Sequence, residues 1–331
     1  IEFTSTLNKF CEENEIELNV SVIFDILAMN NIIVARGDKF SFKFRYWVLY
    51  FAAQRMLHSD EFASYVFSKK NYVSYPEIIE FYTGIDRRRN DAIDIISSDL
   101  TNIISEVASK THIDSNISIY EMLKWEPTQQ QIELIESEVN NTLENSSLPV
   151  ELKDSFADRN YDHLPTLNQN IHKIMDDYSL LKLIKGLSAA SQALRNSDYA
   201  SRSARHQLIE TIVLGQEALN NALVALSPVL AAEGEVTADG ATFVLVGDFK
   251  GSFLSNLQKV VSVLPSNVST WFANDIYSEK MGPLIKNQAT KSVSKLQRHF
   301  FHLLIAMKRP TNWKEVLSNY IFENDKNSFF L

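Results

Sequence analysis

The apolar positions at the start of the chain predict two short helices. Residues 3–13 place Phe and Leu at intervals of three and four, and residues 20–29 repeat the pattern with Val, Ile and Leu. These intervals bring apolar side chains to one side of an α-helix. We therefore expect two amphipathic helices, each with one face turned toward a core.

A small β-hairpin is predicted after these helices. Ile32–Val34 is a β-branched run, and Lys39–Phe44 alternates phenylalanine with polar residues, as a half-buried strand does. The Arg-Gly-Asp sequence at 36–38 supplies the turn between them. Another helix begins at Trp47. The order helix, helix, hairpin, helix is that of a winged helix.

Helical spacing continues through the rest of the chain. A long helix is expected over 91–109, where Ile and Leu form one apolar stripe. Residues 144–168 are polar and have the weakest periodicity, which predicts a linker. Residues 241–246 fit either a short strand or the start of a helix. The other predicted helices span residues 47–57, 61–67, 76–84, 129–143, 168–196, 201–232, 253–264, 268–276, 290–307 and 313–322.

These elements predict a mainly α protein whose only clear β structure is the hairpin. We expect a winged-helix module with its following helices at 1–95, a helical segment and connection at 96–167, and an α-helical C-terminal domain at 168–331. Successive helix pairs in the C-terminal domain would suit an irregular α-solenoid.

Composition and charge exclude several classes of protein. The 331 residues are 45% hydrophobic and 22% charged, with nine Gly and eight Pro, which is typical of a globular helical protein. The formal net charge of -9 argues against general nucleic-acid binding through phosphate neutralisation. The single Cys11 cannot form an internal disulfide, so we expect a cytoplasmic protein. No membrane span or signal peptide is predicted, and because Ile1 opens the chain we expect a piece of a longer protein.

No motif predicts catalysis or nucleotide binding. Three residues separate Gly247 from Gly251, and Lys250 precedes the second glycine, so the stretch 243–252 does not have the spacing of a Walker loop. Ser188 lies in a Gly-x-Ser-x-Ala sequence, but its Leu-rich flanks predict a helix and not the strand-to-helix turn of a nucleophile elbow. We therefore expect no cofactor and no enzymatic activity in this chain.

Two other clusters could carry chemistry. His299 and His302 are three residues apart on a predicted helix, but no third ligand follows at the next turn, so no metal is expected. The arginines at 87–89 could meet a phosphate backbone, but Asp86 and Asp91 lie close enough in sequence to neutralise them. Packing explains the histidines, and a solvated face explains the arginines.

One stretch resembles a known family. Residues 42–53, Phe-Lys-Phe-Arg-Tyr-Trp-Val-Leu-Tyr-Phe-Ala-Ala, resemble the winged-helix signature of STAND-type (NACHT-like) P-loop NTPases. Residues 82–87, Tyr-Thr-Gly-Ile-Asp-Arg, look like the helical segment that follows in bacterial members, and residues 214–216 and 296–306 are loosely similar to their C-terminal helical regions. At Phe44 many members have a His that reaches the nucleotide phosphates, so the resemblance does not carry that contact over.

The resemblance implies a regulatory role. Members are signal-transducing ATPases in which a motor precedes the winged helix and the C-terminal region senses a trigger, and many bacterial members act in anti-phage defence. Because this chain has no Walker loop, it would be the non-catalytic lid and sensor. Its partners would be the NTPase motor domain of the parent protein and an unidentified protein or nucleic-acid trigger, with an oligomer expected on activation. Arg45, Tyr46 and Tyr50 stand at the strand-to-helix junction of the signature and are the predicted motor contacts.

The predicted trigger surface lies in the C-terminal half, whose long helices could stack into a concave face. Trp271 and Trp313 are its predicted anchors, because aromatic residues are enriched among binding hot spots. Most aromatics of this half should be core, since large apolar groups are seldom exposed in patches. The late aromatic set is Trp271, Phe272, Tyr277, Phe300, Phe301, Trp313, Tyr320 and Phe322.

Two other functions fit the same residues. A winged-helix transcriptional regulator would contact duplex DNA through Arg36, Lys39 and Arg45 and use its helical part to bind a ligand or to dimerise. A steep loss of DNA affinity with salt would identify such a regulator. An enzyme with an unrecognised helical active site is the third hypothesis.

Overall fold

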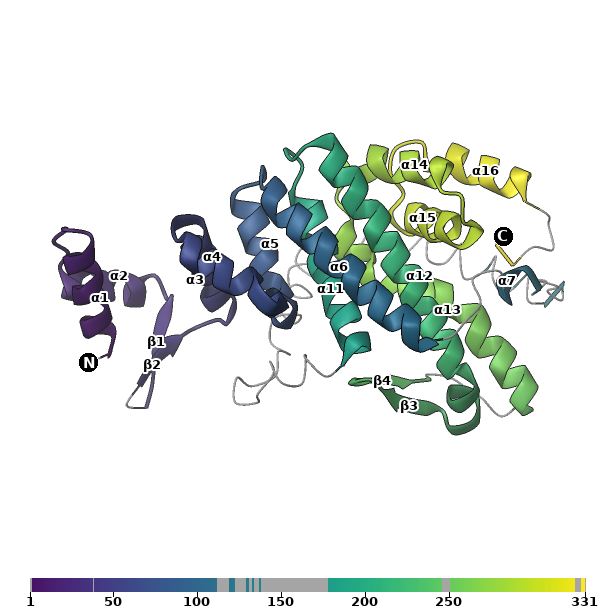
Figure 1. Cartoon of the computed structure of the whole chain (residues 1–331), viewed down its shortest axis with the longest axis horizontal. Coiled ribbons are helices and arrows are strands. Elements are labelled where there is room, and N and C mark those ends of the chain that lie inside the picture. Colours follow the sequence, from purple (N-terminus) through teal and green to yellow (C-terminus); the bar gives the residue numbers. More distant parts are fainter. Residues whose placement is uncertain are drawn as a thin grey trace.

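The computed structural model confirms a mainly helical protein with a small hairpin near its N-terminus (Figure 1). It describes residues 2–37, 39–111, 119–122, 129–130, 133, 137, 178–245, 251–324 and 329–330. The predicted linker at 144–168 lies outside the described residues, as does most of the predicted helix at 129–143 and residues 246–250 of the glycine-containing stretch.

The first elements follow the predicted order helix, helix, hairpin, helix. They are α1 (Glu2–Glu13), α2 (Val20–Met29), β1 (Ile33–Arg36), β2 (Lys39–Phe42) and α3 (Tyr46–His58). The side chain of Asn19 accepts hydrogen bonds from the backbone N–H groups of Ser21 and Val22 and so begins α2. The strands are antiparallel, with Ile33 opposite Phe42. We call residues 2–58 the N-terminal module.

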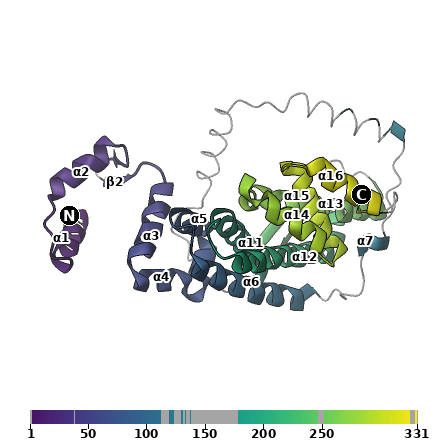
Figure 2. The ribbon, with the colours of Figure 1, turned by 90° about the horizontal axis from the view of Figure 1, so that it is seen from above.

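The N-terminal module buries little of its apolar surface. Leu49 is the first buried residue along the described chain. Of the 28 large hydrophobic side chains that are exposed in the described residues, twelve belong to the first 51 positions. α1, α2 and the hairpin lie at one end of the molecule, and α3 connects them to the remaining helices (Figures 1 and 2). Such a concentration of exposed apolar groups is typical of a surface that a partner covers.

The remaining elements form a helical body, residues 60–324 where described. Its elements are α4 (Asp60–Phe67), η1 (Ser68–Ser74), α5 (Pro76–Ile85), α6 (Asn90–Thr111), α7 (Ile119–Met122), α11 (Ser179–Asn196), α12 (Arg202–Glu233), β3 (Glu235–Ala238), β4 (Ala241–Val244), α13 (Phe253–Ile276), η2 (Glu279–Met281), α14 (Gly282–Lys291), α15 (Lys295–Lys308) and α16 (Trp313–Glu323).

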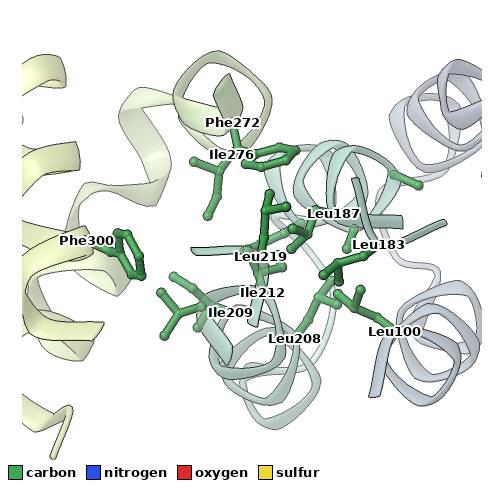
Figure 3. Packing of buried hydrophobic residues seen from close by; sticks show 14 of the residues in the cluster. Leu100, Leu183, Leu187, Leu208, Ile209, Ile212, Leu219, Phe272, Ile276 and Phe300 are labelled. Carbon is green, nitrogen blue, oxygen red and sulfur yellow. The ribbon is translucent and has the colours of Figure 1, made fainter. Parts of the chain in front are cut away.

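The core of the body is built around α11, which contacts α5, α6, α12 and α13. Leu183 and Leu187 of α11 are fully buried and point toward Leu100 of α6 and Leu219 of α12 (Figure 3). A Cβ on Gly215 would lie 2.7 Å from Leu187 Cδ2, so glycine permits the close approach of α11 and α12. One hydrophobic cluster extends from Ala53 to Phe330. The division at residues 95/96 and 167/168 stays a prediction.

The structure corrects the prediction that the N-terminal hairpin is the only β structure. β3 and β4 form a second antiparallel hairpin, which resolves residues 241–246 in favour of a strand as far as Val244. Its turn is Asp239-Gly240, with φ of 47° and 78°. Two successive left-handed residues form the tight turn that suits the twist of a hairpin.

Two predicted helix boundaries were also wrong. Residues 253–276 form one helix through Pro265 instead of two, whereas α12 continues through Pro228 as its predicted range of 201–232 does. Packing against neighbouring helices offsets the hydrogen bond that each proline removes. The helix predicted at 290–307 is instead divided between α14 and α15, and the side chain of Ser294 begins α15 by accepting a hydrogen bond from Gln297 N. In the described ranges, none of the helices has the length and apolar character needed to cross a lipid bilayer.

Candidate interaction surfaces

The predicted motor contacts lie together at the junction of the hairpin and α3. Tyr46 stacks on Phe44 with ring centroids 5.5 Å apart and an interplanar angle of 12°. Trp47 lies 5.0 Å from Tyr46 and 5.8 Å from Tyr50, measured between ring centroids. Arg45 immediately precedes α3, and Arg45, Tyr46 and Tyr50 are all half-buried. The structure therefore places these three residues on one aromatic-rich surface, and their contact with a motor stays a prediction.

Phenylalanines extend this surface onto the hairpin. Phe42 of β2 and Phe51 of α3 have ring centroids 5.7 Å apart, and both remain partly exposed, as does Phe44. We call Phe42, Phe44, Tyr46, Trp47, Tyr50 and Phe51 the aromatic face. Tyr50 ties this face to the helical body, because its ring meets Phe81 of α5 edge-on at 5.9 Å. The aromatic face thus contacts the helical body through Tyr50, while its three phenylalanines remain partly exposed.

Cations surround the hairpin beside the aromatic face. Arg36 is paired directly with Lys39 across the hairpin, and both are exposed. Like charges that face each other across strands are destabilising. Lys43 Nζ lies 5.3 Å from the centroid of the Phe44 ring. An acidic partner or a phosphate backbone would relieve this repulsion, which keeps the alternative of DNA binding open.

The late aromatic residues divide into core and surface. Phe272, Phe300, Phe301 and Tyr320 are buried, as predicted for most of the set. Tyr277 is half-buried against the core. Phe322 is 92% exposed.

Trp271 combines a structural contact with an exposed edge. It stacks on Phe243 of β4, with ring centroids 6.1 Å apart and an interplanar angle of 22°. The stack holds the second hairpin against α13, and 46% of Trp271 remains exposed. The exposed part of Trp271 leaves room for the predicted contact with a trigger. Its contact with Phe243 shows that the side chain also has a packing role.

Trp313 begins α16 and is half-buried against the core. Two cations lie over its ring: Arg309 Cζ is 5.5 Å and Lys314 Nζ is 5.7 Å from the ring centroid. Attraction between a cation and an aromatic ring is worth about 0.5–1 kcal/mol at exposed sites. The sequence analysis did not predict these cations as site residues. The signal was present, because Lys308 and Arg309 precede Trp313 closely in the sequence and Lys314 follows it.

The other sequence candidates have structural roles in the described residues. Ser188 lies on α11 and donates a hydrogen bond of 2.8 Å to Asp275 Oδ2, with no histidine in the pair. The arginines at 87–89 each have a carboxylate partner: Arg87 pairs with Asp198, Arg88 with Asp86 and Arg89 with Asp91.

The histidine pair belongs to an aromatic cluster. The ring of His302 stacks on Tyr320 at 3.7 Å, and Tyr320 OH lies 3.4 Å from His299 Nδ1. Phe330 meets the ring of His299 at 5.5 Å. Burial, together with the charge of His302, lowers the pKa of His299 from 6.5 to about 4, against a backbone hydrogen bond to Phe330 that raises it. His299 is therefore neutral at pH 7 and joins α15 to α16 and the C-terminal residues.

Comparison with known proteins identifies one relation. Residues 1–52 match the model of a protein family described as Novel STAND NTPase 4. This part of the chain is related to STAND NTPases. The matched segment ends within the stretch at 42–53 and contains Arg45, Tyr46 and Tyr50. No curated protein and no solved structure matches the chain.

Proposed function

We propose that this chain is the regulatory and sensor portion of a STAND-type signalling NTPase and is itself non-catalytic. The observation that carries the proposal is a coincidence of two boundaries. The family match ends at residue 52, and the concentration of exposed large apolar side chains in the module ends at Phe51. Apolar groups that an NTPase-family segment exposes are those that another part of such a protein would cover.

The N-terminal module would act as a winged-helix lid on the motor. Its aromatic face offers large rings that are already stacked on one another, so docking would immobilise few additional rotamers. The attachment of Tyr50 to Phe81 would pass a movement of α5 to the face. In this arrangement the helical body holds the motor closed until a trigger, protein or nucleic acid, binds its surface. Anti-phage defence is the setting in which we expect such a protein to act in the cytoplasm.

Nucleotide release from the parent protein tests the lid. Tyr46→Ala and Tyr50→Ala in the intact parent should speed nucleotide release about tenfold and raise basal activity, because an aromatic contact at an interface centre is worth about 1–2 kcal/mol. Tyr65→Ala is the matched control, since Tyr65 is a tyrosine of α4 that is 58% exposed and outside the aromatic face. Equal release rates in all three variants would reject the lid.

DNA binding by the hairpin is the second candidate, and the facing cations Arg36 and Lys39 favour it. Arg36→Gln with Lys39→Gln should then remove a salt-dependent affinity for duplex DNA. Retention of that affinity in the double variant, or its absence in the unaltered chain, would reject the regulator.

A further inference from the structure

The C-terminal helices carry a strong excess of positive charge within an acidic protein. Residues 280–322 contain eight Lys or Arg and a single carboxylate, Glu315, whereas the whole chain has 41 acids and 32 bases. Partners elsewhere in the fold neutralise part of this excess, because Lys280 pairs with Asp198 and Arg298 with Glu323. Four other cations of this segment remain together around the corner between α15 and α16.

We call Lys286, Lys308, Arg309 and Lys314 the basic corner. Lys286 Nζ donates a hydrogen bond of 2.9 Å to the backbone oxygen of Thr311, which lies between Arg309 and Lys314 in the connection to α16. Arg309 and Lys314 share the ring of Trp313. Within the part of the chain that the structure describes, none of the four forms an ion pair. Four cations are thus held near one another by neutral groups.

Burial of one member opposes its charged form within the basic corner. Lys308 donates a hydrogen bond to Asn274 Oδ1, and burial lowers the pKa of its ammonium group. A bound anion would offset the repulsion between these cations.

Apolar surface lies directly beside the basic corner. Thr270 Oγ1 is 3.6 Å from Met307 Sδ, and Met307 is 39% exposed. Trp271 follows Thr270 on α13 and stands one helical turn from Asn274, the partner of Lys308. Both predicted anchors are therefore linked to the basic corner, Trp313 through Arg309 and Lys314 and Trp271 through its neighbours on α13.

We propose that this surface binds an acidic, apolar-anchored segment of another protein. Charge complementarity requires carboxylates on the partner, and the exposed parts of Trp271 and Met307 provide apolar contact area. A nucleic acid fits less well, because single strands need free aromatic faces for base stacking. Phe243 already stacks on Trp271, and two cations already lie over Trp313. This inference rests on the proposed function in one respect, because it takes this surface as the sensor surface. It adds that the trigger is an acidic protein segment.

Two variants with equal loss of charge provide the test. The corner variant is Lys308→Gln, Arg309→Gln and Lys314→Gln. The control is Arg88→Gln, Arg202→Gln and Lys259→Gln, at three exposed cations outside both the basic corner and the hairpin. Short random peptides displayed on phage are selected against the intact chain. The enriched peptides should be rich in Asp and Glu beside Leu, Phe or Trp, and their Kd should rise about tenfold for the corner variant and stay unchanged for the control, since each exposed charge pair adds modestly.

Three results would overturn the inference: enriched peptides without an excess of Asp and Glu, equal affinity for the unaltered chain and the corner variant, or equal weakening by both variants. Tighter binding of single-stranded oligodeoxythymidine than of the peptides, lost in the corner variant, would replace the protein segment with a nucleic acid. Unchanged thermal unfolding of both variants confirms that folding is intact. These measurements do not involve the motor. A negative result here therefore does not reject the lid hypothesis, and rejection of the lid hypothesis does not reject peptide binding at the basic corner.

Discussion

Acidification should weaken the C-terminal part of the helical body through His299. An unfolded chain binds a proton on this ring near the ordinary pKa of 6.5, whereas the folded chain does so only at about 4. Between these values the unfolded state holds more protons, so the free energy of unfolding falls as the pH falls. This difference in pKa corresponds to about 3 kcal/mol of the free energy of unfolding. About 2 kcal/mol of that stability is lost when the pH is lowered to about 5.

Urea unfolding at about pH 7.5 and about pH 5 measures this loss. The unaltered chain should lose about 2 kcal/mol more between the two conditions than His299→Gln, in which the titrating group is gone. His58→Gln is the control, because His58 is exposed at the end of α3, and it should behave like the unaltered chain. Burial also lowers the pKa of His302, so His299→Gln should keep a smaller dependence of the same sign. An equal dependence on pH in the unaltered chain and in His299→Gln would refute the reasoning.

Two further predictions concern packing. Leu183→Ala should lower the free energy of unfolding by about 3 kcal/mol, because Leu183 is fully buried. Leu214→Ala is the control and should cost less than about 1 kcal/mol, because Leu214 on α12 is 47% exposed. Similar losses for the two variants in urea unfolding would contradict the core around α11. Gly240→Ala should destabilise more than Gly234→Ala by about 1–2 kcal/mol. Both glycines have positive φ, but an added Cβ at Gly240 would lie 2.8 Å from Tyr178 Cγ, while the space at Gly234 is open. A larger fall in the thermal midpoint for Gly234→Ala would disprove the overlap.

Local signals in the sequence were sufficient to predict the helices and strands of the N-terminal module. Alternation in Lys39–Phe44 and the spacing in residues 20–29 predicted β2 and α2, because each element is defined by its own side chains. The second hairpin was missed although Asp239-Gly240 is a strong turn signal, because Glu235–Ala238 lacks the alternating phenylalanines that mark Lys39–Phe42. Pro265 misled in the opposite direction, because the packing that tolerates it inside α13 is tertiary.

The candidate surfaces also differ in how far the sequence predicts them. Arg45, Tyr46 and Tyr50 are close in sequence, so their proximity in space was predictable from one helix. The meeting of α13, α14 and the α15–α16 corner was not, because it depends on how separate helices pack. The charge excess of residues 280–322 was visible in the sequence, but only the ion pairs show which of its cations lack a carboxylate.

Amide hydrogen exchange in the N-terminal module tests the central claim most directly, since it requires no substitution. Exchange is compared between this chain alone and the intact parent protein that contains the motor. If the motor covers the module, amides of α1, α2 and the hairpin should exchange at least about tenfold more slowly in the parent, while those of the buried helix α11 stay unchanged. Equal exchange of the module in both proteins would contradict the account, because its exposed apolar surface would then have no partner in the motor.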